Sequence, residues 1–138
     1  MNNEKGITLV ELLATLAIMS MIILLISSVH IFGQKQFTSQ TEQIDNQANV
    51  RLVVNTLTKE IRTVGENTVF VNEGTLTVGT DSYKLVNNDL LKNDVLFVSD
   101  IDEFNVEKDG NKLTISVESL PNQFNKTSSL STVVYIRE

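Results

Sequence analysis

An uninterrupted apolar stretch near the amino terminus constrains the fold more than any other feature of this sequence. From Leu12 to Phe32 the chain reads LLATLAIMSMIILLISSVHIF, and no Lys, Arg, Asp or Glu occurs between Glu11 and Lys35. As a helix this stretch rises about 31 Å, which is close to the hydrocarbon thickness of a bilayer. The stretch therefore predicts a membrane-spanning helix that directly follows one carboxylate.

That carboxylate, Glu11, has two interpretations. A charged side chain costs about 2.5 to 3.5 kcal/mol at the centre of a membrane helix and less near an end. Glu11 is therefore either an interfacial side chain at the head of an ordinary anchor helix or a functional group that needs a charged partner. The residues alone leave both interpretations open.

The residues before the span do not match a conventional secretory signal. The segment MNNEKG is short and weakly basic, and residues 28–32 place bulky side chains where a cleavage site needs small ones. The apolar run also exceeds the about 7 to 15 residues of a cleavable signal. An uncleaved signal anchor stays open, and Lys5 and Lys35 on the two sides of the span leave its orientation undecided.

The stretch KGITLVELLATLAIMSMIILLIS resembles the N-terminus of type IV pilins and pseudopilins. In that family a Gly precedes the scissile bond, and an apolar residue, Thr-Leu-Val/Ile and Glu follow it. The resemblance makes Gly6 the last leader residue, Ile7 the new N-terminus and Glu11 the acid of the motif. It implies cleavage by a prepilin peptidase on the cytoplasmic side, N-methylation of Ile7, and a head outside the cytoplasm that becomes part of a surface filament.

The resemblance also implies a partner for Glu11. Cleavage would create an α-amino group of reference pKa about 8 at Ile7, within the membrane and near an unpaired carboxylate. Pairing the Ile7 amine of one subunit with Glu11 of a neighbour would lower the cost of both charges and pack the helices into a filament. Because the two groups are four residues apart, a contact within one helix is the alternative.

In one respect the chain departs from the family pattern. Many pilins carry a helix-kinking Pro in the apolar segment, whereas the single Pro of this chain is Pro121. We therefore expect a straight first helix in which Gly33 is the weak point, at a cost of about 1 kcal/mol relative to Ala.

After Gly33 the composition becomes polar but a helical period persists. A narrow apolar stripe is formed by Val50, Val54, Leu57, Ile61 and Val64. Phe37, Ile44 and Ala48 are predicted to extend the same face, and Gly65 to cap the helix at its C-terminus. The whole helix is predicted to run from about Ile7 to Val64.

Beyond Gly65 the apolar period changes from helical to two, which predicts strands. The predicted strands are residues 68–71, 75–78, 82–86, 95–98, 104–107, 113–118 and 132–137. Residues 79–81 and 109–111 are predicted to be hairpin turns, and residues 119–131 a longer loop. Leu113, Ile115 and Val117 should face the core, with one sheet face packed on the helical stripe.

These patterns predict an α+β fold: a long N-terminal helix, half transmembrane and half amphipathic, packed on an antiparallel β-sheet, which is the pilin-like lollipop. The predicted division is a leader peptide at 1–6, a transmembrane helix and filament core at 7–33, and an extracytoplasmic head at 34–138. The order of segments loosely resembles minor pseudopilins of the J, PilW and ComGF kind, which favours a minor over a major subunit.

Charge and composition restrict the chemistry of the head. The formal net charge of −6 and singly scattered lysines disfavour direct binding of nucleic acid. No Cys is present, so no disulfide is expected, and the single His30 excludes a metal site of several imidazoles or thiolates within one chain. Asp100, Asp102 and Glu103, with Asp94, form a weak candidate Ca²⁺ site, although a solvated acidic turn explains them better.

No catalytic constellation or cofactor motif is recognisable, so the chain is not predicted to be an enzyme or to carry a cofactor. The favoured function is a structural subunit of a pilus-like filament of the competence, pilus or type II secretion type. Its expected partners are other pilin or pseudopilin subunits, a prepilin peptidase and the membrane. The alternative is a single-pass membrane-anchored binding or sensor module in which Glu11 is incidental.

Overall fold

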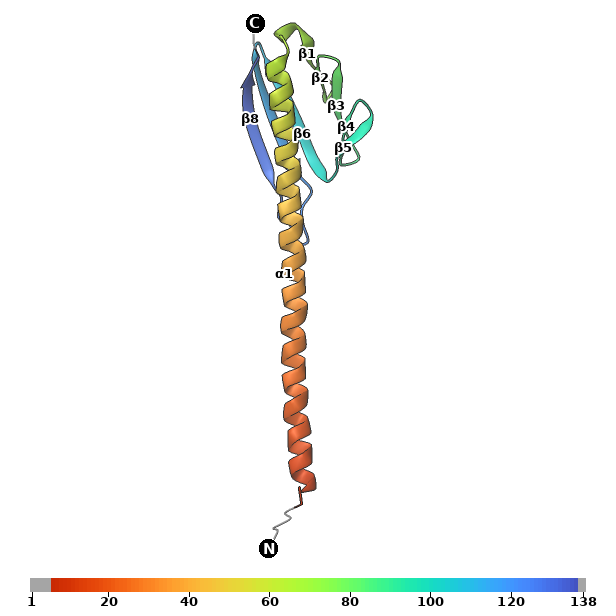
Figure 1. Ribbon diagram of the computed structural model, residues 1–138, viewed down its shortest axis with the longest axis vertical. Coiled ribbons are helices and arrows are strands. Elements are labelled where there is room, and N and C mark those ends of the chain that lie inside the picture. Colours follow the sequence, from red (N-terminus) through yellow and green to blue (C-terminus); the bar gives the residue numbers. More distant parts are fainter. Residues whose placement is uncertain (1–5, 137–138) are drawn as a thin grey trace. The chain divides into compact units, whose positions relative to one another are not determined.

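The computed structural model describes residues 6–136 and divides the chain into two compact units, Met1–Thr38 and Ser39–Glu138 (Figure 1). The predicted leader residues 1–5 and the strand end predicted at Arg137 lie outside the described residues. The domain boundaries predicted from the sequence stay a prediction.

A single helix, α1 (Leu9–Thr63), contributes to both units. The helical assignment continues without interruption through Gly33, which agrees with the absence of Pro from this part of the chain. The helix begins two residues later than predicted because Thr8 serves as its N-cap: the Thr8 hydroxyl accepts the backbone N–H of Glu11 at 3.3 Å.

The predicted glycine cap at the end of α1 is wrong. Gly65 has φ −81° and ψ 162°, an extended conformation rather than the left-handed one of a glycine C-cap. The helix ends at Thr63, and Gly65 instead begins the short 3₁₀ helix η1 (Glu66–Thr68). Both the backbone N–H and the hydroxyl of Thr68 donate to the carbonyl of Gly65, at 3.1 and 2.8 Å.

The strands form two antiparallel sheets rather than the single predicted sheet. The five-stranded sheet follows chain order through β1 (Val69–Asn72), β2 (Thr75–Val78), β3 (Asp81–Val86), β4 (Asp89–Lys92) and β5 (Val95–Val98). Sequence analysis missed β4. Its flanking two-residue turns, Asn87-Asn88 and Asn93-Asp94, have positive φ at both residues, as tight hairpin turns require.

The second sheet has the order β6 (Ile101–Asp109), β7 (Lys112–Ser119) and β8 (Ser129–Tyr135). β8 starts three residues earlier than predicted, so the predicted loop at 119–131 is shorter. The two predicted hairpin turns are confirmed, and Gly79 and Gly110 occupy them with φ of 62° and 56°. Leu113, Ile115 and Val117 are all buried, as their alternation predicted.

One hydrophobic core joins the second half of α1 to both sheets (Figure 1). The predicted stripe is confirmed at Val50, Val54, Leu57 and Ile61, whereas Val64 is only partly buried. The predicted extension of the stripe is wrong, because Phe37, Ile44 and Ala48 are exposed. The helix instead buries the polar residues Ser39 and Asn46. The fold class, α+β with a long helix packed on antiparallel sheets, is confirmed.

Candidate functional site

The residues of the resemblance lie at the very start of α1. Gly6, Ile7 and Thr8 precede the helix and are exposed, and Leu9 is the first helical residue. The peptide bond between Gly6 and Ile7 therefore lies in exposed chain outside the helix. An exposed, non-helical bond is the form that a peptidase can bind.

Glu11 lies in the first turn of the helix, three residues after Thr8. The pattern Thr-x-x-Glu is that of a capping box, and the Thr8 half of the box is formed by the 3.3 Å hydrogen bond. A carboxylate here also interacts favourably with the positive end of the helix dipole. Glu11 thus also contributes to the N-terminal turn of α1. The sequence analysis missed this contribution, although the spacing Thr-x-x-Glu indicates it.

The capping contact leaves the Glu11 carboxylate available to another molecule. Its residue is exposed, and no salt bridge includes it among residues 6–136. Within residues 6–136 the structure therefore does not bring Glu11 into an ion pair. It places the carboxylate four residues from Ile7, near the bond that the motif would cleave.

The helix that follows Glu11 presents apolar side chains on every side. One segment of α1 is long and apolar enough to cross a membrane, with a mean hydropathy of 2.6, and none of that segment is buried in the protein. Thr15, Ser20 and Ser28 donate their hydroxyls to backbone carbonyls three or four residues earlier in the helix. A helix that is apolar all round and satisfies its hydroxyls internally suits lipid or a bundle of similar helices.

The acidic residues of the weak Ca²⁺ candidate do not form a metal-binding group. Within the described part of the chain, no three or more His, Cys, Asp or Glu side chains converge on one position. Asp100 accepts a hydrogen bond from Ser99 at 3.1 Å, and Glu103 accepts one from Asn105 at 3.4 Å. These contacts are those of a solvated acidic surface, and no metal site is proposed.

In the second unit, a charged network ties α1 to the five-stranded sheet. Lys92 on β4 forms salt bridges with Glu60 on α1 at 2.7 Å and with Asp81 on β3 at 2.8 Å. The Tyr83 hydroxyl donates to Glu60. Hydrogen bonds from Lys92 and Asn93 hold the pKa of Asp81 below its usual value. The carboxylates of Asp81 and Glu60 in turn raise the pKa of Lys92.

Tyr83 is the buried member of this network. Its ring is fully buried and packs edge-on against Phe97, with ring centroids 6.0 Å apart. Burial and the hydrogen bond to Glu60 raise the pKa of Tyr83 to about 12. Every group in this network has a partner within the head, so we interpret the network as a structural contact that fixes α1 against the five-stranded sheet.

A second polar contact fastens the loop between β7 and β8 to α1. The buried Asn122 side chain donates to the Ser39 hydroxyl at 2.9 Å and accepts the backbone N–H groups of Phe124 and Lys126, both at 3.0 Å. Asn46 on the helix donates to the carbonyl of Leu120 at 2.9 Å. In this part of α1 the helix is thus held to the loop by polar contacts, at Ser39 and Asn46, rather than by an apolar stripe.

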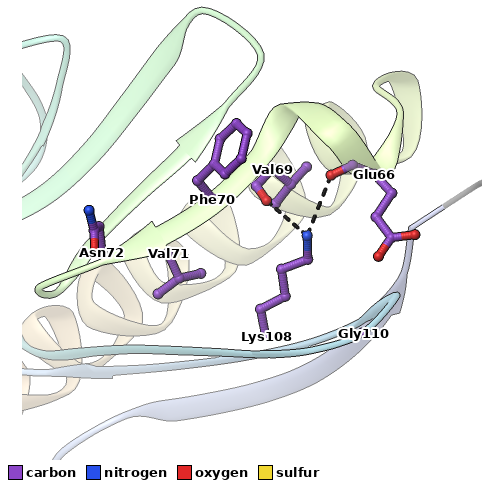
Figure 2. A pocket seen from close by; sticks show the side chains of 7 residues that line it. All are labelled: Glu66, Val69, Phe70, Val71, Asn72, Lys108 and Gly110. Atoms are coloured by element: carbon purple, nitrogen blue, oxygen red, sulfur yellow. Dashed lines mark hydrogen bonds between the residues drawn. The ribbon is translucent and has the colours of Figure 1, made fainter.

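A pocket of about 650 Å³ opens between β1 and β6 (Figure 2). Lys108 reaches from β6 to the carbonyls of Val69 and Glu66, at 3.0 and 3.4 Å, as Figure 2 shows. Its ammonium group is thus used to join the two sheets. Lys108 and Lys92 are two of the lysines that are scattered along the sequence, and both make contacts within the head.

Comparison with known proteins identifies the amino-terminal region. Residues 1–27 match the family model described as the prokaryotic N-terminal methylation motif. The searches of curated proteins and of solved structures found no match. The motif is the class III prepilin signal, and the chain therefore has the N-terminus of a protein processed by a prepilin peptidase. Together with the confirmed fold class, the match supports the type IV pilin and pseudopilin family.

Proposed function

We propose that the protein is a minor subunit of a type IV pilus-like filament, of the competence, pilus or type II secretion type. The N-terminal methylation motif at residues 1–27 carries this proposal. The apolar helix supports it, because a single span of this kind fits a membrane anchor before assembly and a helix bundle after it. The structural role also agrees with a head in which, among the described residues, every buried side-chain N or O atom has a hydrogen-bond partner.

In this proposal the peptidase cleaves between Gly6 and Ile7, and the new N-terminus at Ile7 is methylated. Glu11 then neutralises the Ile7 amine of a neighbouring subunit, while the head lies outside the cytoplasm. The exposed, non-helical chain at Gly6 and Ile7 supports cleavage at this point. The Glu11 residue is exposed and forms no salt bridge among residues 6–136, so its carboxylate is accessible to an amine of another chain.

The cleavage step has a direct test. The wild-type protein is expressed in cells with and without a prepilin peptidase, and the N-terminus of the membrane-extracted chain is sequenced. We expect a chain that starts at Ile7 only when the peptidase is present. Replacing Gly6 with a bulky residue, Gly6→Leu, should block cleavage and leave membrane insertion unchanged. An uncut wild-type chain in cells with an active peptidase would contradict the proposal.

One observation favours a second candidate, a single-pass membrane-anchored binding or sensor module. Glu11 lies in the first turn of α1, where its carboxylate interacts favourably with the positive end of the helix dipole, so the acid has a use that requires no neighbouring subunit. The two candidates separate at the N-terminus, since only the filament subunit requires a chain that begins at Ile7.

A further inference from the structure

The strand β8 is an open edge of the second sheet. It pairs with β7 along one side only, and no strand of the described chain pairs with its other side. Its seven residues, SLSTVVY, contain no charge, Gly or Pro. Natural edge strands are commonly blunted by Lys, Pro or bulges, because their free N–H and C=O groups otherwise pair with another chain. β8 lacks these protections.

The other edge of this sheet, β6, is not open in the same way. It lies against β1, β3 and β4 of the first sheet. The register of β6 also shifts near Ile101, which marks a bulge or irregularity. Of the two edges of the second sheet, β8 is thus the one that can accept a further strand.

A groove of about 260 Å³ runs beside β8, between this strand and α1. The helix lines it with Val50, Gln43, Gln47 and Arg51, and the start of β8 lines it with Leu130 and Ser129. Alternate side chains of a strand added to β8 would point into this groove. The lining suits small neutral side chains, whereas Arg51 repels a cation there.

The opposite face of the sheet is acidic. Cross-strand register places Glu103, Glu118 and Ser129 in one row across β6, β7 and β8. Glu103 and Glu118 are directly opposite each other, an arrangement that costs stability, and no salt bridge neutralises either one in the described chain. Glu107 and Asp109 lie on the same face, and Lys112 is the one basic residue that the three strands place on it.

The small side chain of Ser129 leaves room above β8 for a long side chain from an added strand. Neighbouring strands are about 4.8 Å apart, so a Lys or Arg opposite Ser129 can extend across it toward Glu118. A strand added to β8 would therefore need small neutral residues at the positions that face the groove and basic residues at the alternate positions, which face outward.

We propose that β8 is a docking edge for an extended strand of another protein. That strand carries small neutral side chains toward α1 and Lys or Arg side chains toward Glu118 and Glu103. A second copy of this chain does not fit, since a paired β8 would present Ser129, Ser131, Val133 and Tyr135, without a cation, and would join two chains of formal charge −6. The proposal is independent of cleavage at Gly6.

The test uses the full-length protein in detergent and a labelled synthetic nonapeptide in which Lys and Val alternate. A comparison peptide has the same residues arranged as one block of Lys and one block of Val. Fluorescence anisotropy at low salt should show that the alternating peptide binds about tenfold more tightly than the block peptide. Amide hydrogen exchange should show the protected residues on β8.

Two edge variants locate the binding surface. Val133→Lys places a protecting Lys on β8, where Val133 is 43% exposed, and should weaken binding of the alternating peptide about tenfold. Val95→Lys makes the same change on β5, one of the two edge strands of the other sheet, where Val95 is 68% exposed. It should change the affinity less than about twofold. Circular dichroism checks that both variants are folded.

A charge-reversal pair tests the acidic row without altering the edge. Glu118→Lys should weaken binding about tenfold, whereas Glu73→Lys, the same change in the turn between β1 and β2, should have an effect below about twofold.

Equal affinity for the two peptides, or equal effects of the matched variants, would overturn the proposal. Absence of binding at millimolar peptide would also overturn it. A dimer of the protein that Val133→Lys dissociates would do so as well, because the occupant would then be a second copy.

Discussion

The two units of the chain differ in where their stability can come from. Between Gly6 and Thr38 no residue is buried, although this unit carries the matched family motif. From Ser39 onward the chain encloses a hydrophobic core formed by α1 and both sheets, although the searches of curated proteins and of solved structures found no match. The apolar surface of the first unit is therefore left for a membrane or other chains to cover, whereas the second unit buries a core of its own.

The two units also use acids differently. Glu60 and Asp81 share Lys92 within the second unit, at 2.7 and 2.8 Å. Glu11, in the first unit, has no ion-pair partner among the described residues. If the proposed function is right, the partner of Glu11 is supplied by a neighbour, so loss of Glu11 should affect assembly and spare the fold of the head.

The largest expected effect is that of Glu11→Ala on assembly. Removing one partner of a buried ion pair costs about 3 to 5 kcal/mol, so incorporation into filaments should fall about a hundredfold or more while insertion and cleavage continue. Glu11→Asp should have an intermediate effect, because its carboxylate is one methylene nearer the backbone. The measurement is co-purification with sheared filaments, or filament counts if the subunit is a scarce initiator.

Two controls separate pairing from helix capping. Thr8→Val removes the hydroxyl that accepts the Glu11 N–H but keeps the carboxylate, and a lost cap costs about 1 kcal/mol. Its effect on incorporation should therefore be about tenfold at most. Ser20→Ala, a polar change elsewhere in the span, should have little effect. If Thr8→Val were as harmful as Glu11→Ala, the stability of the start of α1 rather than the carboxylate would limit assembly, and the anchored-module interpretation would be favoured.

The second prediction concerns the core of the head. A fragment from Gln34 to Glu138 should be soluble, unfold cooperatively and show mixed helix and strand by circular dichroism. In it, Leu57→Ala should lower the free energy of unfolding by about 2 to 5 kcal/mol, because Leu57 is 0% exposed. Leu52→Ala on the same helix, at a residue 49% exposed, should cost less than about 1 kcal/mol. Similar costs at both positions would contradict the assigned core face.

The sequence predicted those features of the head that depend on a local period. Val50, Val54, Leu57 and Ile61 share a helical face by spacing alone, and the alternation in residues 113–118 distinguishes the two faces of β7. Strand β4 was missed because Leu90 and Leu91 are adjacent and the register shifts between them, which hides the period of two. The signal available in the sequence was the residue type of its two turns, Asn87-Asn88 and Asn93-Asp94, because Asn and Asp tolerate the positive φ that such turns require.

Other features depend on contacts between distant residues and have no local pattern. The division into two sheets follows the Ser99-Asp100 connection, where Asp100 has φ 61°. Asn122 contacts Ser39 across 83 positions of sequence, and Tyr83 contacts Glu60 across 23. At the candidate site, by contrast, Gly6, Ile7 and Glu11 lie within one short motif, so a single stretch of sequence sufficed to select them.

The third prediction concerns the polar contact between α1 and the loop before β8. Asn122→Ala should lower the free energy of unfolding by about 1 to 3 kcal/mol, because it leaves the backbone N–H groups of Phe124 and Lys126 without their acceptor. Gln123→Ala is the control, since Gln123 makes an exposed contact with Glu42 and its loss should cost less than about 1 kcal/mol. Denaturant unfolding of the 34–138 fragment measures both. Equal stability of the Asn122 variant and wild type would show that water replaces these hydrogen bonds.

The smallest expected effect is a dependence of the head's stability on alkaline pH. Tyr83 has a pKa of about 12 in the folded protein and an ordinary value of 10.0 when unfolded. A group whose pKa is raised by folding stabilises the fold below the unfolded value and loses that contribution as pH rises toward the folded value. The raised pKa of Lys92 acts in the same direction above its ordinary value of 10.5. The free energy of unfolding should therefore fall between about pH 10 and pH 12, and each titrating group contributes at most about 1.4 kcal/mol per pH unit.

Tyr83→Phe should reduce this slope and leave the contribution of Lys92. Tyr135→Phe should preserve the slope, because Tyr135 is 65% exposed and lies outside the network. If the unfolding free energy of the two variants fell with pH at the same slope, ionisation of Tyr83 would not control the alkaline stability. The contact of Tyr83 with Glu60 would then contribute less to the fold of the second unit than its geometry indicates.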